Sequence, residues 1–427
     1  MRDGEYALWH GSIGLGGRVF AERDRVLVEG RGVRVRDAGG RWLLDSRSSL
    51  RTVTFGHSYT PIIDAINRQL YRLPYAETIR HDRPSDVVIS FSDKLIDALP
   101  EQYTRVRLSS SGSRMVEEAI VVARFARVSG EGSVGRTDII ANKGAWHGLG
   151  GIASAATDDP ALQQWAGPLN SGFHHVEPND LDALDRLIEK IGVHRLAAIL
   201  IEPINGVTAT MLEPEYVRGI YQRCQQNGLY LIADEISTGM GRTGYLSYCD
   251  HLGVRPDLLV LGKGISSGYV PVTALAITEN VYRTAVKAWP RIIPHSSSTD
   301  GSPLAAAAGL AVLEALSDGD VLLRVRSLGE WLGARLAALA ARTSAIAETL
   351  GTGFMHFVNM RTDTGWDRAC MHELSQACEK RGLLIDHVWG RTVIWTPPLI
   401  TTQDELEEMV DIFAAALDDT LQWSGIA

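Results

Sequence analysis

Short apolar runs alternate with amphipathic stretches through residues 60–302. Residues 229–233 and 258–261 are wholly apolar, which is typical of strands buried on both faces of a parallel sheet. Residues 117–128 and 215–226 instead carry apolar positions at helical spacing. Strands that alternate with helices predict an α/β domain, built on a large and mostly parallel sheet with helices on both faces.

The two ends of the chain follow a different pattern. Residues 26–45 alternate apolar and polar positions between glycine turns, which predicts a small antiparallel meander. A helical region at 303–342 leads to alternating segments near 354–360 and 391–396 and to an amphipathic helix at 403–422. We therefore expect a smaller α+β domain formed from both termini. The predicted regions are 1–59 with the meander, 60–302 as the large α/β domain, and 303–427 as the C-terminal part of the small domain.

Composition limits the classes of function. The chain has 427 residues, of which 45% are hydrophobic, so it is long enough for a large core and more than one domain. A net charge of -9 gives no electrostatic support for nucleic acid or an anionic membrane as partner. The N-terminus lacks the apolar core of a signal peptide, and we expect a cytoplasmic protein. The four cysteines lack Cys-x-x-Cys spacing, so we predict reduced thiols and no metal site; they are Cys224, Cys249, Cys370 and Cys378.

Two polar residues stand where predicted strands end. Residues 229–233 run directly into Asp234, and Lys263 lies between two glycines just after residues 258–261. The carboxyl ends of parallel strands share the sheet edge at which ligands bind in open α/β folds. An amine and a carboxylate at that edge suit pyridoxal 5'-phosphate, whose aldehyde condenses with a lysine and whose ring nitrogen is kept protonated by an acid. We interpret Lys263 as the catalytic amine and Asp234 as the partner of the ring nitrogen.

Several motifs occur in one order along the chain. Residues 231–244 (LIADEISTGMGRTG), followed by 261–264 (LGKG), resemble the class III aminotransferases of the type I pyridoxal phosphate fold. The resemblance implies that fold, that cofactor and an aminotransferase activity. It also implies a set of cofactor contacts, which are Gly112, Ser113, Trp146, His147, Glu202, Asp234, Ile236, Lys263 and Ser298.

Each implied contact has a plainer reading. Residues 109–113 precede a predicted helix whose free amides suit a phosphate, but they also fit an ordinary serine N-cap. Trp146 aligns with an aromatic residue that stacks on the ring, whereas a lone tryptophan is more often part of a core. The following His147 and Gly148 favour stacking. Ile236 resembles the aliphatic residue on the opposite face of the ring.

Residues 295–304 resemble a segment through which family members reach the cofactor phosphate of the neighbouring subunit. Ser298 aligns with the hydroxyl that makes this contact. The resemblance therefore implies a homodimer with a shared active site. The alternative reading is a polar loop that caps the helix beginning at Pro303.

Substrate-side positions depart from the family pattern. Val207 stands where many members that use glutamate carry a glutamate, and Ile394 stands where the arginine for the substrate's α-carboxylate would be. An arginine fork is the usual way to hold a carboxylate. We therefore expect a substrate without a conventionally bound α-carboxylate. Arg51 and Arg391 lie in segments that border the substrate in relatives and are candidates for a different anion clamp, although such arginines are more often solvated.

Position alone suggests an aromatic-rich pocket that includes Trp9 and His387. We predict an enzyme that moves an amino group between a small-molecule amine donor and a ketone or aldehyde acceptor by a ping-pong mechanism. A specialised biosynthetic step on an amino ketone or a modified peptide terminus would suit these residues. The alternatives on the same fold are an aminomutase, a racemase, a decarboxylase or a biotin-pathway-type ketone aminotransferase. A protein without turnover is disfavoured because lysine, aspartate and phosphate cup are all present, and a phosphate-loop ATPase lacks its motif.

Overall fold

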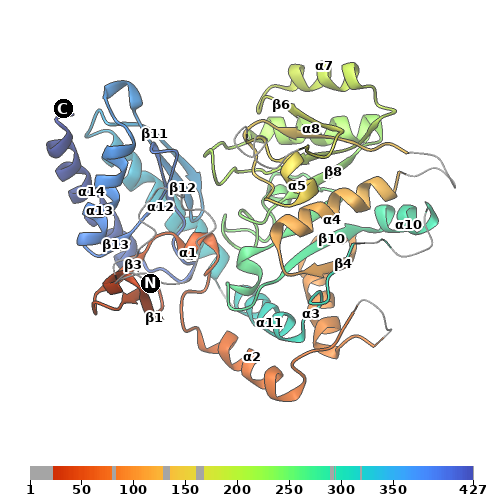
Figure 1. The fold of residues 1–427 in the computed structure, drawn as a ribbon, viewed down its shortest axis with the longest axis horizontal. Coiled ribbons are helices and arrows are strands. Elements are labelled where there is room, and N and C mark those ends of the chain that lie inside the picture. Colours follow the sequence, from red (N-terminus) through yellow and green to blue (C-terminus); the bar gives the residue numbers. More distant parts are fainter. Residues whose placement is uncertain are drawn as a thin grey trace.

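The computed structural model describes residues 23–78, 83–127, 135–159, 168–288, 293, 295–317 and 320–426. Figure 1 shows a large sheet with its helices on one side of the molecule, and the two ends of the described chain together on the other side. Trp9, one of the candidate substrate residues, lies outside the described residues.

The large sheet has seven strands. Their spatial order is β4 (Tyr103–Ser109), β10 (Thr273–Thr278), β9 (Leu258–Leu261), β8 (Tyr230–Asp234), β7 (Leu196–Ile201), β5 (Asp138–Asn142) and β6 (Phe173–Val176). The five strands from β9 to β6 run parallel, and β10 is antiparallel to both of its neighbours. The structure therefore confirms the mostly parallel sheet expected from the apolar runs.

Both faces of this sheet are covered. Along β8, Leu231 and Ala233 belong to one hydrophobic cluster, whereas Tyr230 and Ile232 belong to another on the opposite face. Such alternation within an unbroken apolar run requires helices on both sides. The helices of this part are α2 (Thr60–Arg72), α3 (Asp86–Ala98), α4 (Gly112–Phe125), α5 (Gly151–Ala156), α7 (Leu181–Ile191), α8 (Pro214–Asn227), α9 (Tyr248–His251), α10 (Glu279–Ala288) and α11 (Pro303–Ser317).

Two four-stranded sheets form the smaller part. One contains the meander β1 (Leu27–Arg31), β2 (Arg34–Asp37) and β3 (Trp42–Asp45), joined in parallel by β13 (Leu383–Leu384). The other has the order β11 (Ile346–Thr352), β12 (Met355–Met360), β15 (Thr392–Trp395) and β14 (Asp386–Val388). Helices α12 (Val321–Ala340), α13 (Arg368–Lys380) and α14 (Gln403–Ser424) accompany them. The β3–β13 pair confirms that both ends of the chain build this part.

The helical region expected at 303–342 is two helices, α11 and α12. Helix α11 packs against α2 and α3 and against the short turn η2 (Lys263–Ser266), so it supports the sheet edge that carries Lys263. The boundary placed at 302 remains a prediction. All four cysteines are buried free thiols. Among the described helices, none combines the length and the apolar character needed to cross a lipid bilayer.

Candidate active site

Strands β8 and β9 bring the predicted acid and amine to one edge of the sheet. The two strands are parallel neighbours, with Asp234 in register with Val260, and Lys263 opens the turn η2 just beyond β9. Lys263 has a left-handed φ of 43°, which is uncommon for a residue with a side chain. Its Nζ atom donates a hydrogen bond to Ser237 Oγ at 2.6 Å. The amine is therefore held at the carboxyl end of the sheet, as the sequence predicts.

The environment of Lys263 favours a neutral amine. Desolvation inside the protein, followed by the nearby Arg51 guanidinium, lowers the pKa of Lys263 from 10.5 to about 8. The carboxylates Glu202 and Asp234 act in the opposite direction without reversing the shift. A lysine with a lowered pKa is a better nucleophile and proton acceptor near neutral pH.

Asp234 is held by hydrogen bonds in a cavity that Lys263 also lines. It is buried, and its Oδ2 atom lies 2.9 Å from His147 Nδ1 while Oδ1 accepts a hydrogen bond from the Ile236 amide at 3.2 Å. His147 is also buried, and its Nε2 atom has no hydrogen-bond partner. The histidine thus orients one edge of the carboxylate, and Asp234 also lines the cavity. A buried carboxylate so placed fits a protonated ring nitrogen.

The expected phosphate cup lies at the start of α4. Its N-cap residue Ser111 is extended, with φ −141° and ψ 135°, and its side chain makes no capping hydrogen bond. The first amides of α4 are thus available to an anion, which disfavours the ordinary serine cap. Gly112 and Ser113 line the cavity. A Cβ on Gly112 would lie 3.0 Å from Ile236 Cδ1, so glycine keeps the space above Ile236 open.

Trp146 and Ile236 line the same cavity, as expected for residues on the two faces of a ring. Glu202 connects the loops behind them: its carboxylate accepts hydrogen bonds from the amides of Trp146 and Gly206, each at 3.3 Å. Burial, together with the nearby Asp234, raises the pKa of Glu202 to about 7. These residues form one cavity of about 420 Å³, and their chemistry fits pyridoxal phosphate.

Only some of the candidate substrate residues lie at the cavity. Arg51 is buried and lines the cavity. His387 and Arg391 are exposed and do not line it. Ser298 is also exposed and outside this chain's cavity, and its carbonyl oxygen accepts a hydrogen bond from the Tyr75 hydroxyl at 2.6 Å. Its expected contact with a neighbouring subunit remains a prediction.

Sequence reasoning missed three kinds of contact. Ser237, the hydrogen-bond acceptor of Lys263, lies inside the 231–244 motif, and its place after Asp234 was the available signal. Thr273 and its neighbours at 270–272 line the cavity from the start of β10 without any motif of their own. Arg242 is buried, and its guanidinium donates to the carbonyls of Phe354 and Pro397 rather than to a carboxylate.

Comparison with known proteins agrees with this geometry. Residues 20–417 match the family model of the class III aminotransferases. The chain is 31% identical to an acetylornithine aminotransferase of Caldanaerobacter subterraneus subsp. tengcongensis, over 93% of this chain and 94% of that protein. It is 28% identical to an omega-aminotransferase of Caulobacter vibrioides, over 94% and 95% respectively.

Solved structures of transaminases share this fold. A pyridoxal-phosphate-bound amine transaminase from an uncultivated Pseudomonas species superposes with a TM-score of 0.91 and 27% identity, covering 98% of this chain and all of that one. An (S)-enantioselective omega-transaminase from Thermomicrobium roseum gives 0.88 and 27%, with 96% of each chain covered. The predicted fold, cofactor and enzyme class are thereby confirmed. The chain belongs to the class III pyridoxal-phosphate-dependent aminotransferases.

Proposed function

We propose that this enzyme moves an amino group between an amine donor and a ketone or aldehyde acceptor in two half-reactions at one site, with ping-pong kinetics. The observation that carries the proposal is the convergence of Lys263, Asp234 and the open start of α4 on one cavity. When bound, pyridoxal phosphate supplies an electron-accepting ring that stores the amino group between the half-reactions.

The residues of this chain have separate tasks in that reaction. Lys263 Nζ would take the proton from the substrate carbon that bears the nitrogen and hold it for return. Asp234, oriented by His147, would keep the ring nitrogen of the cofactor protonated. The first amides of α4, with Gly112 and Ser113, would hold its phosphate, and Trp146 and Ile236 would enclose its ring.

The substrate we propose lacks a conventionally bound α-carboxylate. Ile394 is fully buried and does not line the cavity, and Val207 lines it without a charge. An amino ketone or a modified peptide terminus in a specialised biosynthetic step remains the class that these positions suit best. We also propose a homodimer in which Ser298, which is exposed and outside this chain's cavity, serves the neighbouring site.

The test is a single half-reaction. The cofactor-loaded enzyme is mixed with individual amine donors while its visible absorbance is followed, with Lys263→Ala as control. Conversion to the spectrum of the aminated cofactor, reversed by a carbonyl acceptor, supports the proposal and ranks the donors. A wild-type spectrum that shifts on binding but never converts would overturn transamination and favour an aminomutase, a racemase or a decarboxylase on the same fold.

A further inference from the structure

One positive charge in the cavity has no strong partner. Arg51 is only 7% exposed and lines the cavity with Lys263. Its Nη1 atom donates to the carbonyl oxygen of Gly206, while its buried Nε atom has no hydrogen-bond partner among the described residues. The carboxylate of Asp386 lies 3.8 Å from Nη2, beyond hydrogen-bond distance, and its Oδ2 atom is equally unpartnered. Within the described part of the chain, the Nε–Nη2 edge of the guanidinium therefore faces Asp386 without a hydrogen bond to it.

The Nε–Nη2 edge has the geometry of a carboxylate receptor. Arginine binds a carboxylate through two parallel N–H groups, and the Nε–Nη2 pair is one of the edges that do so. Gly206 makes this orientation possible, because a Cβ at that position would clash with Arg51 Nη1. Nη1 is thus anchored to the backbone, while Nε and Nη2 make no hydrogen bond to the described residues.

An unusual backbone brings Arg51 to this place. Ser48, Ser49, Leu50 and Arg51 all have left-handed φ values, of 45°, 46°, 69° and 66°. No residue of this turn is a glycine, so each is disfavoured in that conformation. Such a conformation persists where the surrounding contacts determine it, and it is found most often at functional sites.

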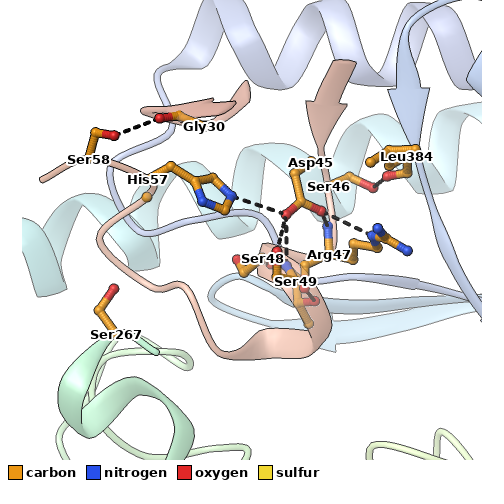
Figure 2. Close-up of polar contacts among 12 residues, drawn as sticks. Gly30, Asp45, Ser46, Arg47, Ser48, Ser49, His57, Ser58, Ser267 and Leu384 are labelled. Carbon is orange, nitrogen blue, oxygen red and sulfur yellow. Dashed lines mark hydrogen bonds and ion pairs between the residues drawn. The ribbon is translucent and has the colours of Figure 1, made fainter. Parts of the chain in front are cut away.

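The contacts that hold the turn come from both parts of the molecule. Figure 2 shows Ser49, Arg47 and His57 converging on the buried carboxylate of Asp45. Asp45 Oδ2 accepts hydrogen bonds from the Ser49 amide at 2.7 Å and the Ser49 hydroxyl at 3.1 Å. Arg242 Nη2, from beyond β8, donates to Ser48 Oγ at 3.2 Å. The turn is therefore fixed on one side by Asp45 and on the other by Arg242.

The guanidinium also lies close to the residue that pairs with Ile394 in the smaller part's sheet. Asp386 of β14 is directly opposite Ile394 of β15, so their side chains share one face of the sheet. Arg51 approaches that face through Asp386. The 48–51 turn thus brings an arginine close to Asp386, the strand partner of the position at which the family resemblance implies an arginine.

We propose that Arg51 is the receptor for a carboxylate on one of the two substrates, and that this carboxylate displaces Asp386 as the neighbour of the guanidinium. The proposal rests on the proposed function and narrows it: one substrate is an amino or keto acid whose carboxylate is held from the 48–51 turn. Asp45 and Arg242 are positioning residues, because they act on the substrate through that turn.

Equilibrium binding tests this without requiring turnover. Propionate and its neutral analogue propionamide are titrated into the cofactor-loaded enzyme, and the change in the cofactor's visible absorbance gives each dissociation constant. We expect the wild-type enzyme to bind propionate at least tenfold more tightly than propionamide. Arg51→Met should remove that preference, and Asp386→Asn should strengthen propionate binding because the competing carboxylate is gone.

Arg391→Met is the matched control, since it removes an exposed arginine outside the cavity and should leave both constants unchanged. Equal affinity of the wild-type enzyme for propionate and propionamide overturns the proposal, as does an unchanged preference in Arg51→Met. If Arg51→Met fails to fold, the Asp386→Asn result decides, and unchanged or weaker propionate binding overturns the proposal. Failure of the proposed function shows separately, as a wild-type enzyme that no amine donor converts.

Discussion

The β8–β9 edge and the 48–51 turn both place charged groups in one cavity, but the first does so with regular strands and the second with an irregular turn. At the edge, Asp234 ends β8 and Lys263 follows β9, two strands whose residues are all buried and regularly paired. At the turn, Arg51 is presented by four successive left-handed residues that depend on Asp45 and Arg242. The sheet edge carries the residues that match the family motifs, whereas the turn carries the residue that we propose recognises the substrate. Positions that distinguish substrates can therefore differ while the strands that carry the catalytic residues keep their geometry.

The largest effect is expected from Lys263→Ala. Removing the amine eliminates both the covalent anchor and the proton carrier, so turnover should fall by roughly 10⁴-fold or more. The cup at α4 is untouched, and the variant should still bind pyridoxal phosphate without a covalent bond. Steady-state kinetics with the best donor measures the loss of turnover, and a cofactor titration measures the retained binding. Turnover within about tenfold of the wild type would place the catalytic amine elsewhere.

Asp234→Asn should rank second. The amide preserves shape but no longer carries the negative charge that stabilises a protonated ring nitrogen, so turnover should fall on the order of 10²–10³-fold. Glu202→Gln is the matched control. Burial and Asp234 raise the pKa of Glu202 to about 7, so about half of these side chains are already neutral near pH 7, and glutamine removes only part of a charge there. We expect less than roughly a tenfold loss for that variant. Equal losses in both variants would contradict a specific role for Asp234.

The same contrast explains what the sequence predicts well. Asp234, Lys263, Gly112 and Trp146 follow strands or open a helix, so a motif and its place in an alternating pattern suffice to bring them together. Arg51 could also be named as a candidate anion-binding residue, because its segment borders the substrate in relatives. Its contacts with Gly206 and Asp386 could not be predicted, because they depend on a left-handed turn in a stretch without glycine.

Two candidate residues show why proximity in sequence is a weaker guide. Asp386 and His387 are neighbours on β14, where successive side chains point to opposite faces. Asp386 approaches Arg51, and His387 is therefore exposed on the other face. Arg391 lies in the tight connection to β15, where Trp389 and Gly390 have positive φ values and the arginine side chain is exposed. Strand phase and turn geometry, rather than residue type, keep both out of the cavity.

Asp45→Ala tests whether Asp45 holds the 48–51 turn in place. It leaves the half-buried amide and hydroxyl of Ser49 without their acceptor, which should destabilise the protein by about 2 kcal/mol. The KM for a carboxylate substrate should also rise, because Arg51 is no longer held. Chemical denaturation gives the first quantity and steady-state kinetics the second.

The control is another buried carboxylate of the same meander. Asp37 accepts hydrogen bonds from the backbone amide and Nε of Arg41, both at 2.8 Å, and touches no part of the 48–51 turn. Asp37→Ala should therefore destabilise the protein to a similar degree while leaving KM unchanged. If both variants raise KM equally, Asp45 supports the meander and not the turn.

The smallest effect links the two regions through charge. Desolvation and then the Arg51 guanidinium lower the pKa of Lys263 to about 8, so in the apoenzyme this group is deprotonated at a lower pH than in the unfolded chain. Between about pH 8 and 10.5 the unfolded state binds more protons, and this lysine therefore makes the apoenzyme more stable as pH rises through that window.

Arg51→Met removes one cause of the lowered pKa and leaves desolvation, so the pKa of Lys263 should move upward without reaching 10.5. The rate at which apoenzyme incorporates pyridoxal phosphate reports the neutral amine, and its midpoint should shift to higher pH in Arg51→Met but not in Arg391→Met. An unshifted midpoint would mean that the turn and the sheet edge act on the substrate independently, with no electrostatic coupling between recognition and the catalytic amine.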